Sequence, residues 1–144
     1  YCVYAAAKYV SQVFYDYGEG FSQENSILIH DCFTEEKDVH FTVDVPKGVK
    51  QIRIDPCSYR CAVTVKDIAA GEQHFAKDNM TVNGVWANEN CVIFDTEDPN
   101  LVFACEGVDR LDVTLEVVEL PESLTATLIE VVTPKENGLK RFFH

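Results

Sequence analysis

The feature that most constrains this chain is a two-residue period of apolar side chains. It is clearest in residues 39–45, where Val39, Phe41, Val43 and Val45 alternate with His40, Thr42 and Asp44. Successive side chains of a β-strand point to opposite faces of its sheet, so this alternation buries one face and leaves the other in water. The segment is therefore predicted to be a half-buried strand of an antiparallel sheet.

Other short segments show a similar pattern and are predicted to be strands: residues 13–17, 26–30, 49–55, 61–66, 91–94, 101–104 and 111–119. In the segment 49–55, Ile52 and Ile54 are expected to point inward and Arg53 outward, and Pro56 ends the strand because it has no N–H to donate. Turn-forming residues, among them Asn83 and Gly84, separate the segments. About eight or nine short strands with such spacing predict an all-β, antiparallel, jelly-roll-like sandwich.

The length of 144 residues suits one domain with one hydrophobic core. We expect the sandwich to occupy residues 12–120. Residues 1–11 are expected to be a linker or an N-terminal extension, and residues 121–144 a C-terminal strand or helix followed by a linker. Leu124, Thr127 and Leu128 have helical spacing, but the β-branched content of this segment favours an edge strand, so both alternatives remain open.

A net charge of -12 opposes binding to phosphate backbones or anionic lipids. Nucleic acid is therefore excluded as the main partner. No segment reaches the roughly 18 apolar residues that a membrane-spanning helix requires, so direct membrane insertion is not expected. The first residues lack the charged and apolar regions of a secretory signal, and both ends are expected to join the domain to a larger protein.

Six cysteines would allow many disulfide pairings, and their order along the chain does not select one. Cys61 and Cys91 lie in apolar strand patterns, where a reduced cysteine behaves as a small hydrophobic residue. Free thiols in a reducing compartment are therefore favoured. Cys57 and Cys61 have CxxxC spacing without a second pair or a neighbouring histidine, which gives little support to a zinc site.

The motifs of the common enzyme classes are missing from this sequence. It contains no GxSxG, GxGxxG, GxxxxGK[ST] or HExxH, and its four histidines suggest no catalytic triad. Paired carboxylates could hydrolyse glycosides, but among 24 acidic residues such pairs arise by chance. The isolated domain is therefore predicted not to be an enzyme and to need no cofactor.

One acidic turn is a weak candidate for structural calcium. Asp95, Glu97 and Asp98 offer several oxygen ligands, as calcium requires. The spacing of a known calcium loop is absent, which favours a polar loop held by its own side chains.

Aromatic side chains are the stronger binding candidates, because the flat faces of sugars stack on rings while nearby carboxylates and amides bind the hydroxyls. The candidate carbohydrate-binding residues are Trp86, Tyr17, Tyr59, Tyr15, Glu19 and Asn88. Large aromatics are more often core residues, and this alternative applies most strongly to Tyr15. Trp86 lies among polar neighbours, so an exposed ring and a ring that caps one end of the sandwich are both consistent with the sequence.

Three sequence segments resemble those of a known protein family: residues 12–26 (QVFYDYGEGFSQENS), 49–56 (VKQIRIDP) and 94–100 (FDTEDPN). They resemble the β-sandwich modules attached to bacterial cell-surface polysaccharide glycosyltransferases of the rhamnan-synthesis and family 2 type. The resemblance implies a noncatalytic accessory domain that binds or positions a glycan for an adjacent transferase domain in the same polypeptide. It identifies no sugar ligand by residue, and the segment 57–61 departs from the family pattern.

Two functions follow as expectations. The first is a carbohydrate-binding module for polysaccharide biosynthesis, located in the cytoplasm or associated with the membrane through its parent protein. The second is a structural or protein-interaction domain that packs on the catalytic domain or mediates oligomerisation. Exposed aromatic rings on a concave surface would favour the first function, and buried rings the second.

Overall fold

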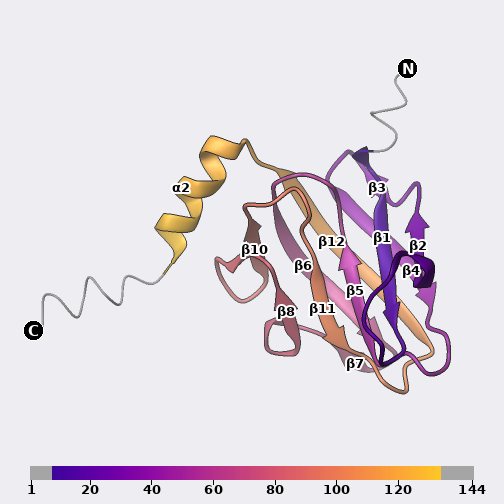
Figure 1. Ribbon diagram of the computed structural model, residues 1–144. Coiled ribbons are helices and arrows are strands. Elements are labelled where there is room, and N and C mark those ends of the chain that lie inside the picture. The colour runs from indigo at the N-terminus through magenta and orange to yellow at the C-terminus, as the bar shows by residue number, and fades with distance from the viewer. Residues whose placement is uncertain (1–7, 134–144) are drawn as a thin grey trace, which may run out of the picture.

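The computed structural model describes residues 8–133, which form two antiparallel sheets packed face to face and one short helix (Figure 1). One sheet has the strand order β2-β1-β5-β11-β8. Its strands are β1 (Ser11–Asp16), β2 (Ser26–Ile29), β5 (Gln51–Asp55), β8 (Met80–Val82) and β11 (Leu101–Ala104). This arrangement confirms the predicted all-β sandwich.

The other sheet has seven strands, with the order β3-β4-β12-β6-β10-β9 and with β7 paired to β6. Its strands are β3 (Phe33–Thr34), β4 (Asp38–Asp44), β6 (Cys61–Ala70), β7 (Gln73–His74), β9 (Val85–Trp86), β10 (Cys91–Phe94) and β12 (Arg110–Glu119). Two single 3-10 turns, η1 (Gln23–Asn25) and η2 (Lys77–Asn79), precede β2 and β8.

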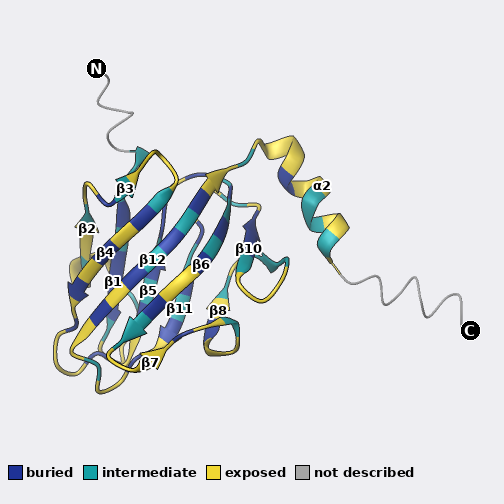
Figure 2. Ribbon diagram, turned by 180° about the vertical axis from the view of Figure 1, so that it is seen from behind, coloured by how far each residue is buried: buried dark blue, intermediate teal, exposed yellow. Residues whose placement is uncertain are grey.

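The predicted alternation is present in the long strands. In β4 and β12, buried and more exposed residues follow one another along each ribbon (Figure 2). Ile52 and Ile54 of β5 are fully buried in the core between the sheets, while Arg53 points to the outer face and is half-buried. The period-two pattern therefore identified these longer strands and their inward faces.

Four strands were not predicted: β3, β7, β8 and β9. Each has only two or three residues, too few to display a period. In addition, β6 continues to Ala70, beyond its predicted end at Lys66. The pairing of β6 with β12 shifts register between Thr114 and Leu115, so Lys66 and Asp67 are both exposed and the alternation is interrupted there.

The segment after Pro121 is a helix, α2 (Glu122–Val132), and not the alternative edge strand. Thr125 is fully buried, and its hydroxyl donates to the carbonyl of Pro121 at 2.8 Å, which satisfies this side chain inside the helix. The helix contacts β9 and β10 and projects from one end of the sandwich (Figure 1). Arg60 connects it to the sandwich, because its guanidinium lies 3.0 Å from Asp95 and 3.9 Å from Glu122.

The strands of the sandwich extend from Ser11 to Glu119. The linkers expected at the two ends fall mainly on residues 1–7 and 134–144, which lie outside the described residues, as does Cys2. Within residues 8–133, no helix is both long enough and apolar enough to cross a membrane.

Candidate functional site

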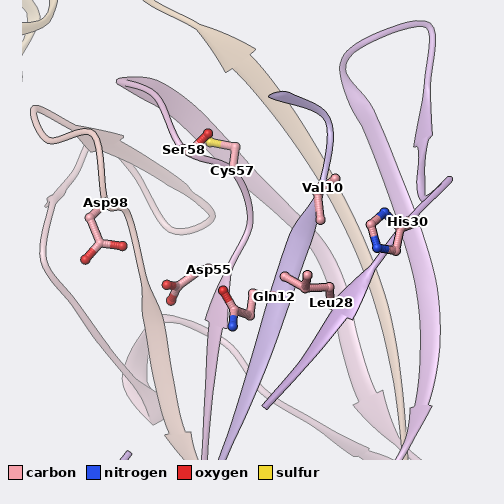
Figure 3. A pocket seen from close by; sticks show the side chains of 8 residues that line it. All are labelled: Val10, Gln12, Leu28, His30, Asp55, Cys57, Ser58 and Asp98. Carbon is pink, nitrogen blue, oxygen red and sulfur yellow. The ribbon is translucent and has the colours of Figure 1, made fainter. Parts of the chain in front are cut away.

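An open groove of about 370 Å³ lies on the outer face of the five-stranded sheet (Figure 3). Its lining residues come from the start of β1, the strand β2, the end of β5 and two loops. They are Val10, Gln12, Leu28, His30, Asp55, Cys57, Ser58 and Asp98. The groove thus combines apolar side chains with amide, carboxylate, hydroxyl and imidazole groups.

Strand register produces the floor of this groove. Gln12 of β1 pairs with Leu28 of β2 on one side and with Asp55 of β5 on the other. Because paired residues of neighbouring strands point to the same face, these three side chains form one row across the sheet. The Nε2 of Gln12 donates to Ser26 Oγ at 2.9 Å, and Ser26 Oγ donates to the Gln23 carbonyl at 2.7 Å, so the amide has a fixed orientation.

The neighbouring row supports the groove from one side. Arg53 donates to both carboxylate oxygens of Asp55, at 2.7 and 2.8 Å, and its guanidinium carbon lies 4.5 Å from the ring centre of Phe14. Phe14 is therefore buried although it points away from the core between the sheets. A third group, the carboxylate of Asp98, lies 3.7 Å from Arg53.

The pKa of each partner of this ion pair is raised, but for a different reason. The pKa of Arg53 is raised, chiefly by its hydrogen bonds to Asp55. The pKa of Asp55 is also raised, because loss of hydration at its carboxylate outweighs the favourable contact with Arg53. Asp55 therefore has a higher proton affinity than an aspartate in water, and its carboxylate is held rigidly beside the groove.

The predicted aromatic residues do not form a common surface. Tyr15 and Tyr59 are buried, and the hydroxyl of Tyr15 donates to the Asp44 carbonyl at 3.1 Å. Burial raises the pKa of Tyr15 to about 12 and that of Tyr59 further. Trp86 is half-buried in β9 and packs against the core. Tyr17, just after β1, is the most exposed of the four, at 40%.

The two polar candidates lie apart from each other. Glu19 is exposed in the turn after β1. Asn88 is exposed between β9 and β10, where its side-chain oxygen accepts the backbone N–H groups of Asn90 and Cys91 and stabilises the turn. None of the six predicted carbohydrate-binding residues lines the groove.

The carboxylates of the acidic turn that was a calcium candidate form salt bridges with two arginines. Asp95 and Glu97 lie 3.0 and 3.5 Å from Arg60, whereas Asp98 is near Arg53. Among the described residues, no three His, Cys, Asp or Glu side chains are arranged to hold a metal ion. Each of the three carboxylates thus lies near a guanidinium group.

The residues of the groove were mostly missed at the level of sequence. Asp98 was considered for calcium and Asp55 as the last residue of a predicted strand, while Gln12 precedes the predicted start of its strand. The available signal was the outward phase of the alternation: Gln12 and Asp55 occupy outward positions of β1 and β5. Nothing in one strand alone indicates that these positions are neighbours.

Comparisons with known proteins add no relative. The chain matches no protein-family model, and neither curated proteins nor solved structures give a significant match.

Proposed function

We propose that this chain is a noncatalytic module that binds or positions a glycan for a bacterial glycosyltransferase domain of the same polypeptide. The observation that carries the proposal is the groove on the outer face of the five-stranded sheet. Its amide and carboxylate groups suit sugar hydroxyls, and the side chains of Val10 and Leu28 suit the apolar faces of a sugar ring. The resemblance of residues 12–26, 49–56 and 94–100 to transferase-attached modules points in the same direction.

Binding is expected to be weak. The groove is open to solvent, so ordering of the ligand and loss of hydration offset much of the contact energy. Uncharged glycans are the first ligands to test, because two carboxylates, those of Asp55 and Asp98, line the groove. Negatively charged glycans are expected to be disfavoured by the same carboxylates.

The test is a titration of the full chain with a panel of glycans, in which changes in nuclear magnetic resonance chemical shifts measure binding. Gln12→Ala should weaken binding about fivefold to tenfold, as expected from the loss of about one hydrogen bond. Gln73→Ala is the matched control, because Gln73 is an exposed glutamine on β7 of the other sheet. Absence of binding to every glycan would refute the proposal. Loss of binding in Tyr17→Ala or Trp86→Ala, but not in Gln12→Ala, would move the site away from the groove.

A second candidate function, protein interaction, is favoured by the burial of Tyr15 and Tyr59 and by the exposed apolar side chains of α2. Leu124 and Val131 are 43% and 70% exposed and lie seven positions apart, on one side of the helix. This surface suits packing on the transferase domain or on a second copy. Sedimentation of the full chain tests self-association: Val131→Lys should abolish a dimer that the neighbouring Glu130→Lys preserves. A monomer at all concentrations would exclude oligomerisation.

A further inference from the structure

Two cysteine side chains touch each other beside the groove. The cysteines of the described segment, Cys32, Cys57, Cys61, Cys91 and Cys105, are free thiols. The Sγ of Cys57 donates a hydrogen bond to the Sγ of Cys61 over 3.5 Å. Since a disulfide needs a separation of about 2 Å, a small movement of one side chain would bring the sulfurs to bonding distance.

The connection between β5 and β6 keeps these thiols together. At its start, Ser11 Oγ donates to the Pro56 carbonyl at 2.8 Å. At its end, the N–H of Leu120 donates to the Arg60 carbonyl at 2.9 Å. Both ends of the five-residue connection are thus tied to other parts of the sandwich. The contact between the two sulfurs is therefore held in place by the hydrogen bonds at both ends of this short connection.

The two thiols differ in access. Cys57 is buried except for 4% of its surface, and it contributes to the wall of the groove, at its upper edge in Figure 3, whereas Cys61 is fully buried at the start of β6. The pKa of Cys61 is raised, first by the hydrogen bond with Cys57 and then by burial, so Cys61 is protonated in the reduced pair and is not the thiol that attacks first. The groove is therefore the side from which a reagent would approach Cys57, and Cys61 has no exposed surface of its own.

We propose that Cys57 and Cys61 form a thiol-disulfide exchange site, independent of the proposed glycan function. The reaction partner is a low-molecular-weight disulfide such as oxidised glutathione. The Cys57 thiolate attacks one sulfur of the reagent, its S–S bond breaks, and the first glutathione leaves and takes up the proton lost by Cys57. Cys61 then attacks Cys57 Sγ, loses its proton, and expels the second glutathione as a thiol. Two electrons pass from the cysteine pair to the reagent.

The test uses the full chain, reduced and then equilibrated in glutathione buffers of increasing oxidised fraction. After the remaining thiols are alkylated, trypsin cuts between Arg60 and Cys61 and separates the two cysteines into different peptides. We expect one bond that joins these two peptides, a mass lower by two hydrogens, and reversal by dithiothreitol. The other four of the six cysteines should be alkylated.

Matched variants test the order of attack. Cys61→Ala should retain glutathione on Cys57, because the resolving thiol is missing, and Cys57→Ala should leave Cys61 unmodified. Cys105→Ala, which removes another buried thiol, should form the bond as the parent chain does. The proposal is overturned if the parent chain keeps six free thiols across the redox range, joins a different pair, or accumulates glutathione without forming the internal bond.

Discussion

The outer faces of the two sheets have similar chemistry but different organisation. On the five-stranded sheet, the side chains of Arg53 and Asp55 are 24% and 12% exposed, and Arg53 covers the buried ring of Phe14. On the seven-stranded sheet, His40 bonds to Asp112 at 3.0 Å, but these side chains are 64% and 55% exposed. Lys66 lies 3.8 Å from both Asp38 and Glu116, also in water.

This difference shows that polar pairs on a sheet become a preorganised surface only when something excludes water from them. An exposed pair contributes little, because water competes for its groups and its side chains must be ordered. A half-buried pair holds its geometry, since an unpaired charge there would be costly. The five-stranded face therefore has the more rigid groups for a ligand, and the following experiments can break or sharpen this contrast.

The largest difference should come from the apolar residues of the two faces. Phe14→Ala should lower the free energy of unfolding by about 3 kcal/mol, because it removes a buried ring and the support of Arg53. Val118→Ala, at an exposed position of β12, should cost about 0.5 kcal/mol. Urea unfolding measures both values. Equal losses would show that the outer face of the five-stranded sheet is not organised around Phe14.

The charged residues should differ next. Arg53→Ala leaves the carboxylate of Asp55 buried without its bidentate partner, so we expect a loss of about 2 kcal/mol in the free energy of unfolding. Lys66→Ala should cost less than about 0.5 kcal/mol. A loss for Lys66→Ala as large as that for Arg53→Ala would contradict the contrast in burial. Urea unfolding in low and high salt measures both variants and the screening of each pair.

A smaller contrast concerns single hydroxyl groups. Ser26→Ala removes the acceptor of the Gln12 amide and should cost about 1 kcal/mol in the free energy of unfolding. Thr42→Val removes an exposed hydrogen bond to Asp112 and should cost less than about 0.5 kcal/mol. Thermal unfolding of both variants checks the order. If Ser26→Ala is neutral, the Gln12 amide is not held by Ser26.

The smallest effect is a change in pH dependence. Because folding raises the pKa of Asp55, the native protein binds its proton more tightly than the unfolded chain does. The contribution of this group to stability therefore falls as the pH rises from 3.8, the ordinary value, through the raised folded pKa. In Asp55→Asn this fall should be missing, whereas Gln73→Ala, at an exposed position of the other sheet, should run parallel to the parent. A fall of unchanged size in Asp55→Asn would assign it to another group.

Much of the fold could be predicted because alternation is a local property. Strands β4 and β12 have uninterrupted periods, so their inward faces could be identified from neighbouring residues alone. Strands β7 and β9, with two residues each, could not be recognised this way. In β6 the bulge at Lys66 and Asp67 changed the phase of the pattern in the middle of the strand.

The groove was much less predictable than the fold. Leu28, Gln12 and Asp55 form one row only because three strands pair in a particular register, and no local pattern encodes that register. The aromatic candidates did not indicate the groove, because Tyr15 has the inward phase of β1 and Tyr59 packs into the core. A polar residue at an outward position is common on any sheet, so Gln12 could be distinguished only once its neighbours were known.

The position of β12 also has a consequence for how the chain acquires its structure. This strand pairs with β4 and β6 in the middle of the larger sheet, and bonded residues such as His40 and Asp112 are 72 positions apart. During synthesis, β4 and β6 are made well before β12. Until β12 is made, the edges of β4 and β6 that pair with it have no hydrogen-bonding partner. Such distant pairing is typical of domains that fold in milliseconds to seconds. Until β12 has been made, the unpaired edges of β4 and β6 favour aggregation.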